Sequence, residues 1–258
     1  MTSGPTPAKA WLEREGALLR LRLARPKANV IDGAMTAALA GALARFAGTA
    51  DLRAVLLDHD GPNFSFGASV EEHLPDQCKA MLEGFHGLIA RLLDCPVPVL
   101  VAARGQCLGG GLEVATAGTL LFTAPDTKLG QPEMQLGVFA PAASCLLPAR
   151  IGQAAAEDLL YSGRVIDAGE ARSMGLVQEI AEDPEEAALG YFDRHLAPKS
   201  ASSLRFATGA ARADFAARMK ERLRAVEALY LDGLMATRDA SEGLEAFLEK
   251  RPARWENR

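Results

Sequence analysis

Hydrophobic residues in the N-terminal part of the chain follow first a strand-like and then a helix-like spacing. Across Leu19–Leu23 three leucines alternate with two arginines, which predicts a strand with one face in water. Apolar residues then recur at helical spacing over Met35–Phe46, and the continuous apolar run Ala54–Leu57 predicts a strand covered on both faces. The order of elements is therefore strand, helix, strand.

The same alternation continues through the middle of the chain. It predicts a helix over Asp76–Leu93, a buried strand over Val97–Ala103, a short helix over Gly110–Ala117 and a strand over Leu120–Ala124. The last strand is expected at Leu176–Ile180. Strands separated by helices indicate an α/β fold with largely parallel sheets.

The C-terminal part of the chain has a helical pattern only. Met219–Leu234 carries an amphipathic apolar stripe, and a second helix is expected around Leu244–Leu248. Pro198 marks a soft boundary, so we divide the chain into a core of residues 1–198 and a helical region of residues 199–258. This region could pack on its own core or on a neighbouring subunit.

The amino-acid composition limits which binding partners and which cellular compartment we expect for the protein. The chain has 258 residues, 49% of them hydrophobic, and a formal charge of −5, which offers no basic surface for nucleic acid. Its four cysteines form no C-x-x-C pair, so we expect reduced thiols and no metal site. Because no segment has the apolar length of a signal peptide or membrane span, we expect a cytoplasmic protein that does not bind membranes.

The densest chemical signal is the glycine-rich segment Gly105–Glu113, which follows a predicted buried strand and begins a helix. The first N–H groups of a helix have no internal partner, and glycines let a ligand approach them closely. An oxyanion site and simple tight packing of helix on strand are both consistent with the glycines alone. The spacing does not match G-x-G-x-x-G, a Walker lysine or a G-x-S-x-G elbow.

Two further clusters follow predicted strands. Asn63–Ser69 could supply a second exposed N–H from a turn, although an ordinary glycine loop explains it equally simply. Lys128–Glu133 places a carboxylate after a proline-restricted turn, where a single glutamate is usually solvated or capping. Neither cluster is specific by itself.

Together the order and spacing of the three clusters resemble the crotonase, or enoyl-CoA hydratase/isomerase, superfamily along nearly the whole chain. The resemblance implies a crotonase-like spiral of repeated ββα units with a C-terminal helical region. It also implies an oxyanion hole for a thioester oxygen, formed by the N–H groups of Ser65 and Gly110. Glu113 and Glu133 match the two catalytic glutamates of the family's hydratases, so a hydro-lyase acting on an acyl-CoA is expected.

The resemblance extends to residues for CoA and its acyl group. Its implied binding residues are Lys27, Ala28, Asn29, Phe66, Gly67, Ala68, Pro141 and Lys250. The CoA thioester is then the substrate and no separate cofactor or metal is expected. By analogy with the family, we also expect a homotrimer or a hexamer made of two trimers, with the helical region of residues 199–258 at the interface.

One segment departs from the common family pattern. Hydratases usually continue with L-G-x-x-P-G-x-G-G after the second glutamate, whereas this chain has Leu136–Ser144, with Pro141 at a glycine position. Proline has no N–H with which to hold the reacting water. Ser69 likewise stands where the family often has Asp.

These departures resemble the cyclohexa-1,5-diene-1-carbonyl-CoA hydratases of anaerobic benzoyl-CoA degradation. The resemblance implies addition of water to a conjugated cyclic diene, giving 6-hydroxycyclohex-1-ene-1-carbonyl-CoA. Two alternatives stay open: a straight-chain enoyl-CoA hydratase with a rebuilt water site, and a noncatalytic scaffold that binds acyl-CoA or RNA. Both glutamates and the negative charge weigh against the scaffold.

Overall fold

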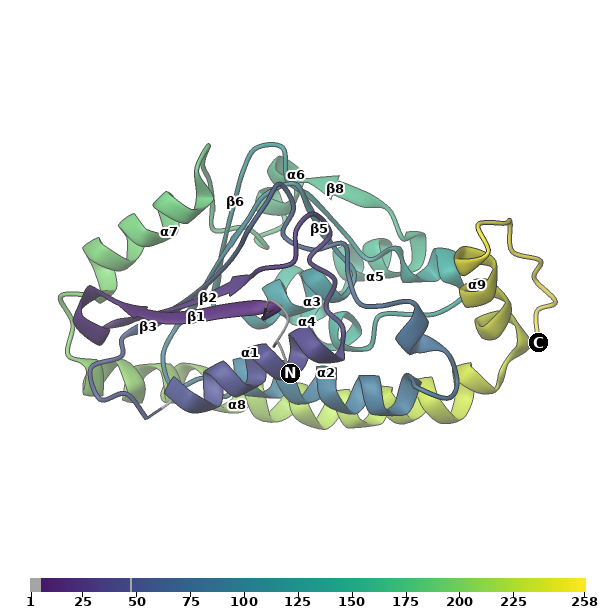
Figure 1. Cartoon of the computed structure of the whole chain (residues 1–258), viewed down its shortest axis with the longest axis horizontal. Coiled ribbons are helices and arrows are strands. Elements are labelled where there is room, and N and C mark those ends of the chain that lie inside the picture. Colours follow the sequence, from purple (N-terminus) through teal and green to yellow (C-terminus); the bar gives the residue numbers. More distant parts are fainter. Residues whose placement is uncertain (1–5, 47) are drawn as a thin grey trace.

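The computed structural model describes residues 6–46 and 48–258 and contains two sheets (Figure 1). The larger sheet has the strand order β1-β2-β3-β4-β6-β9, in which β1 pairs antiparallel and the others pair parallel. Its strands are β1 Ala8–Glu13, β2 Leu18–Leu23, β3 Ala54–His59, β4 Val99–Ala103, β6 Leu120–Thr123 and β9 Glu179–Ile180. The smaller sheet has the order β5-β7-β8, comprising β5 Gln106–Leu108, β7 Lys128–Gly130 and β8 Val165–Asp167.

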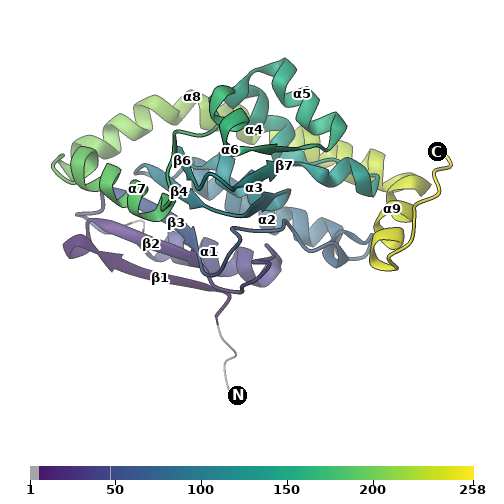
Figure 2. The same ribbon diagram turned by 90° about the horizontal axis from the view of Figure 1, so that it is seen from above.

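Helices cover both sides of the larger sheet. The helices of the described residues are α1 Gly33–Phe46, α2 Cys78–Leu93, α3 Gly110–Ala117, α4 Pro141–Ile151, α5 Gln153–Ser162, α6 Ala168–Ser173, α7 Pro184–Tyr191, α8 Ala201–Ala228 and α9 Arg238–Leu248, and only some of them cover that sheet. In Figure 1, α1, α2 and α8 lie together on one side of β1–β3, and α7 lies on the other. In Figure 2, α9 lies at the end of the molecule opposite α7. The predicted parallel α/β organisation is confirmed.

Alternate residues of the central strands pack into two different cores. Val55 and Leu57 of β3 face the large core shared with α1 and α2, whereas Ala54 and Leu56 face a smaller core with Phe192 beyond α7. All four side chains are almost fully buried. Because successive side chains of a strand point to opposite faces, a continuous apolar run suits a strand covered on both sides.

The strand over Leu19–Leu23 is present, but its predicted water-facing side is wrong. Arg20 is only 3% exposed and donates to Asp58, Glu13 and Glu185. Arg22 donates to both carboxylate oxygens of Asp58, at 2.7 and 2.8 Å. The alternating arginines therefore belong to a buried ion-pair network, where each charge has partners that offset its loss of water.

Helix α8 begins at Ala201, shortly after Pro198, and the division into residues 1–198 and 199–258 stays a prediction. The Ser200 hydroxyl caps α8 by accepting from the Ser203 N–H at 3.4 Å, and α8 packs against α2 and α4 of the core. All four cysteines are buried and unpaired, which confirms the prediction of free thiols. Over the described residues, no helix combines the length and apolarity that a membrane crossing requires. The same residues contain no cluster of three or more potential metal ligands.

Candidate active site

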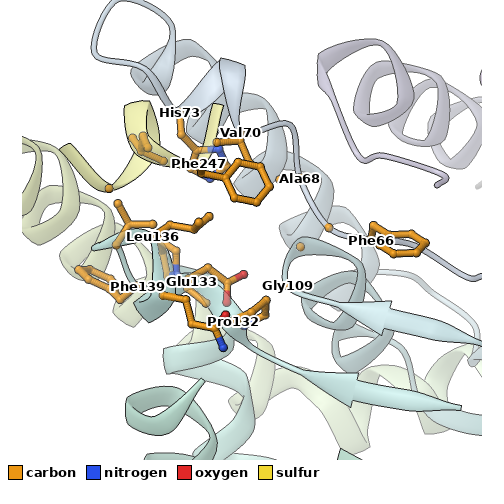
Figure 3. A pocket seen from close by; sticks show the side chains of 18 of the residues that line it. Phe66, Ala68, Val70, His73, Gly109, Pro132, Glu133, Leu136, Phe139 and Phe247 are labelled. Carbon is orange, nitrogen blue, oxygen red and sulfur yellow. The ribbon is translucent and has the colours of Figure 1, made fainter. Parts of the chain in front are cut away.

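Four separate parts of the chain enclose a pocket of about 480 Å³ (Figure 3). They are the loop Phe66–His73, the start of α3, the segment Pro132–Pro141 and the C-terminal stretch Gly243–Ala253. Apolar side chains of α2 complete the wall, namely Met81, Leu82 and Phe85. The pocket therefore brings together Gly110, Glu113, Glu133, Pro141 and Phe66–Ala68, all of which the sequence predicted as site residues.

The glycine triplet allows two backbone segments to approach closely at the pocket. A Cβ on Gly110 would lie 3.0 Å from the Ala68 nitrogen, and one on Gly111 would lie 2.5 Å from Ser65 Cβ. Gly109 has a positive φ of 50° as it enters α3. Because a side chain at either Gly110 or Gly111 would crowd the loop, the glycines have a specific steric role at this junction.

The prediction that Ser65 supplies an oxyanion-hole N–H is wrong. Its N–H donates to the Gln106 carbonyl at 2.9 Å, its carbonyl accepts from Leu108 at 3.0 Å, and its hydroxyl accepts from the Gly67 N–H at 3.0 Å. Ser65 therefore joins the loop to β5, and sequence spacing could not reveal this pairing. A parallel bridge uses the donor that a ligand would otherwise receive.

Ala68 and Gly110 are the pocket residues to consider in place of Ser65. Within the residues that the structure describes, neither N–H has a hydrogen-bond acceptor, and both residues line the pocket. Gly110 is the first residue of α3, so its N–H is one of the donors that a helix leaves unpaired. These two N–H groups are therefore the candidates for an oxyanion hole, and the dipole of α3 adds partial positive charge at Gly110.

Glu113 is held in the first turn of α3 by the start of another helix. Its Oε1 accepts the Ala143 N–H of α4 at 2.8 Å, and the side chain is almost fully buried. Burial raises the pKa of Glu113 to about 7, although the N–H groups of Ala143 and Ala142 act in the opposite direction. The carboxyl is therefore oriented by α4 and able to exchange a proton near neutral pH.

Glu133 faces the pocket from a short 3₁₀ turn, Pro132–Leu136, beside Gly109 (Figure 3). Its Oε1 lies 2.6 Å from the position that a Cβ on Gly109 would occupy. With its amide nitrogen turned to the carboxylate, Gln131 donates to both oxygens at 3.2 and 3.1 Å. Burial, followed by the charge of Glu113, raises the pKa of Glu133 to about 8.

Pro141 occupies the first position of α4, where a helix N–H has no partner within the helix. The next two N–H groups, of Ala142 and Ala143, are directed at Glu113. The start of α4 thus holds a catalytic candidate and has no N–H at Pro141 for water. The sequence predicted that this donor is missing, because proline has no N–H.

The predicted CoA residues divide into those that line the pocket and those that do not. Phe66, Gly67, Ala68 and Pro141 line it, and Lys27, Ala28, Asn29 and Lys250 do not. Phe66, half exposed, points away from the glutamates at the pocket rim, and its N–H donates to the Ala28 carbonyl at 2.9 Å (Figure 3). Lys27 and Lys250 are exposed and do not line the pocket, so their roles stay predictions.

Asn29 is not available to a ligand, contrary to its predicted role. It is fully buried, and its amide nitrogen donates to the carbonyls of Asp60 and Asn63 at 3.0 and 2.9 Å. Its side-chain oxygen accepts the Arg25 N–H at 2.9 Å. Asn29 therefore stabilises the turn beside the pocket, a role that requires contacts distant in sequence.

Several lining residues were not predicted from the sequence. His73 lies with Val70 and Phe247 at one end of the pocket (Figure 3), and Arg251 is a further lining residue. His73 Nδ1 lies 2.6 Å from the Ser69 carbonyl, and burial lowers the pKa of the ring. Isolated histidines and helix-end arginines give no sequence signal that distinguishes them from surface residues.

Residues 13–258 match the family model described as Enoyl-CoA hydratase/isomerase. The chain belongs to the enoyl-CoA hydratase/isomerase family. This confirms the family inferred from the three motif clusters.

Two curated members of the family illustrate the range of similarity. The cyclohexa-1,5-dienecarbonyl-CoA hydratase of Thauera aromatica is 66% identical over 258 residues, covering 100% of both chains. A probable enoyl-CoA hydratase of Rhizobium meliloti is 31% identical, covering 96% of this chain and 97% of its own.

Solved structures of the enoyl-CoA hydratase/isomerase family have the same fold. The crystal structure of an enoyl-CoA hydratase/isomerase from Pseudoalteromonas atlantica T6c matches with a TM-score of 0.84 and 26% identity, covering 96% of this chain and 99% of that one. An enoyl-CoA hydratase from Bacillus halodurans matches with a TM-score of 0.86 at 19% identity, over 93% and 99% of the chains. The crotonase-like fold is thereby confirmed.

Proposed function

We propose that this protein hydrates cyclohexa-1,5-diene-1-carbonyl-CoA to 6-hydroxycyclohex-1-ene-1-carbonyl-CoA, a step of anaerobic benzoyl-CoA degradation. The observation that carries the proposal is the 66% identity, over the full length of both chains, to the Thauera aromatica hydratase. The pocket supports it with two buried glutamates and two free main-chain donors. The scaffold alternative gives no reason for these features to occur together.

The two main-chain donors stabilise the charge that the reaction creates. When the oxygen of water bonds to the carbon β to the thioester, electrons move through the conjugated system to the thioester oxygen. The N–H groups of Ala68 and Gly110 are fixed by the backbone at the pocket, so in this proposal they bind that oxygen with little reorganisation. Loss of one such donor typically costs about 3 kcal/mol of transition-state stabilisation.

The two glutamates have different environments, which favours different proton roles. Glu113 receives main-chain N–H groups that stabilise its carboxylate, so we assign it as the base that removes a proton from water. Glu133 has the higher pKa, about 8, and is assigned as the acid that protonates the far end of the diene. A proton then passes from Glu113 to Glu133, and the net change is the addition of one water.

The lining of the pocket suits an apolar acyl group. Phe85, Phe139 and Leu82 form apolar walls around the glutamates, and Pro141 adds a rigid ring to the same wall. Such walls remove apolar surface of a bound ring from water, at about 25 cal/mol per Å². A straight-chain enoyl-CoA is the competing substrate in the test.

The test is incubation of the purified protein with cyclohexa-1,5-diene-1-carbonyl-CoA and, separately, with crotonyl-CoA. Mass spectrometry should show the diene thioester gaining one water, and the ultraviolet spectrum should change from that of a dienoyl thioester to that of a singly unsaturated enoyl thioester. Turnover of crotonyl-CoA should be much slower. A diene thioester that stays unchanged while crotonyl-CoA is hydrated would replace the proposal with the straight-chain function.

The remaining parts of the proposal concern cofactors, assembly and location. Hydration is redox-neutral overall, so we infer that no cofactor other than the CoA of the substrate is needed. Exposed apolar side chains at Met134, Tyr161 and Val165 support contact with further copies of the chain, as a trimer or hexamer. We expect a cytoplasmic enzyme, because CoA thioesters are its substrates. Light scattering of the purified protein tests the assembly.

A further inference from the structure

The carboxyl end of α3 is held by two arginines from neighbouring helices. Arg150 of α4 donates to the carbonyl of Thr116 at 3.1 Å and also to that of Gly118, directly after the helix. Arg212 of α8 donates to the Ala117 carbonyl at 2.9 Å. The last carbonyls of a helix have no partner within it, so the two guanidinium groups satisfy acceptors that α3 leaves free.

The charges of both arginines depend on α3 for their stabilisation. Their hydrogen bonds go to main-chain carbonyls and to the Thr119 hydroxyl rather than to carboxylates. Burial, followed by the charge of Arg212, lowers the pKa of Arg150 to about 10. The ring of Phe215 lies against both, with guanidinium carbons 5.4 and 5.7 Å from its centroid. The negative end of the α3 dipole and this ring therefore offset the burial of two like charges.

Helices α3 and α4 are joined at both ends of α3. At the amino end of α4, the Ala143 N–H donates to Glu113 in the first turn of α3 at 2.8 Å. About two helical turns further along α4, Arg150 holds the carbonyls at the carboxyl end of α3. These two contacts are separated by about 10 Å along α4, so together they fix the angle between the helices. Either contact alone would leave α3 able to pivot about it.

We propose that Arg150 is a positioning residue for the hydration, which keeps the Glu113 carboxylate and the Gly110 N–H in place by fixing the far end of α3. The inference rests on the proposed function. Gly110 and Glu113 both belong to the first turn of α3, so a rotation of the helix would displace the donor and the base together. Arg150 is not among the residues that line the pocket, and it acts through α3 alone.

The test compares Arg150→Met and Arg150→Lys with Arg205→Met as a matched control. Arg205 is also partly buried and also donates to a main-chain carbonyl, but that carbonyl belongs to Thr49 in the loop between α1 and β3. Arg150→Met should lower kcat about tenfold through misplacement of the reacting groups, with KM changed less than about twofold. Arg150→Lys keeps a charged donor and should recover part of this loss, and the control should keep wild-type kcat. Unchanged kcat in Arg150→Met overturns the proposal.

The titration of Glu113 separates positioning from a purely structural role. With the far end of α3 released, the Ala143 N–H should hold Glu113 less firmly, so the pKa of Glu113 should rise further above its ordinary value in Arg150→Met. Carbon-13 NMR of the ligand-free proteins measures this pKa, with Glu113→Gln to assign the signal. The titratable groups on which the Glu113 charge acts, Glu133, Cys145 and Tyr230, are the same in every Arg150 variant.

A lower unfolding temperature of Arg150→Met, with the Glu113 pKa unchanged, would show that the arginine only stabilises the fold and overturns the proposal. The proposed function fails by a different result, namely a diene thioester that the wild type leaves unchanged. In that case the Glu113 pKa and the rates of the same variants on crotonyl-CoA decide the role of Arg150.

Discussion

The main-chain N–H of Ala143 donates to Glu113 Oε1 at 2.8 Å, so the start of α4 fixes the carboxylate carried by α3. The contact uses α4 donors that would otherwise be free. It also opposes the effect of burial on the Glu113 pKa, which leaves the group able to change protonation state near neutral pH.

Replacement of either glutamate by glutamine should abolish most hydration. Glu113→Gln and Glu133→Gln are each expected to lower kcat by at least about a hundredfold, the usual scale for loss of a proton-transfer group. CoA-thioester affinity, measured by calorimetry, should change little because the donors of Ala68 and Gly110 remain. The matched control is Glu182→Gln, at an exposed glutamate outside the pocket. Full turnover by either active-site variant would show that the replaced glutamate is not a catalytic residue.

The pH profile of kcat/KM should be bell-shaped. Hydration needs an ionised Glu113, so the rate falls as pH drops through about 7, the raised pKa of that group. It also needs a protonated Glu133, so the rate falls as pH rises through about 8. Initial rates in buffers of constant ionic strength test this. A rate that keeps rising on the alkaline side would show that Glu133 is not the acid.

The raised pKa of Glu113 also predicts how stability depends on pH. A carboxyl whose folded pKa lies above its ordinary value of 4.5 favours the folded state when protonated. The wild type should therefore lose stability as pH rises from 4.5 to about 7, relative to Glu113→Gln, by roughly 3 kcal/mol at most. Urea unfolding of both proteins at several pH values measures this. Parallel stability curves would contradict it.

Gly110→Ala tests the assignment of the oxyanion hole. Its Cβ would lie 3.0 Å from the Ala68 nitrogen, so it should separate the two donors and lower kcat by about a hundredfold. The control is Gly41→Ala in α1, whose Cβ would meet no atom within 4 Å. That variant should keep full activity and gain about 0.5–1 kcal/mol. Infrared spectroscopy should show a smaller shift of the bound thioester carbonyl in Gly110→Ala only.

The spacing of hydrophobic residues predicted the helices and strands whose buried apolar side chains recur at regular intervals. The helix at Gly110–Ala117 and the strands at Ala54–Leu57 and Leu120–Ala124 are present with boundaries close to those predicted. The short strand β5 could not be recognised, because three residues give too little periodicity. The last strand was predicted over Leu176–Ile180, whereas in the structure β9 spans Glu179–Ile180.

The site was predictable as a set of segments but not as a set of atoms. Ser65 and Ala68 belong to the same loop, and only the pairing of Ser65 with Gln106 reveals that Ala68 has the free donor. Asn29 and Arg20 fail as predictions for a related reason, since each is satisfied by partners far along the chain. Long-range hydrogen bonding decides which polar groups are free, and one sequence does not show it.

Backbone donors and substrate walls come from different parts of this molecule, which bears on how the protein could change over evolution. The two N–H groups are independent of side-chain identity, whereas the walls around them combine residues of α2, the Pro132–Pro141 segment and α9. Substitutions in any one of these elements can reshape the acyl compartment without disturbing the donors. A preference for a new thioester substrate can therefore be acquired through single substitutions in the walls, each of which leaves the two main-chain N–H groups in place.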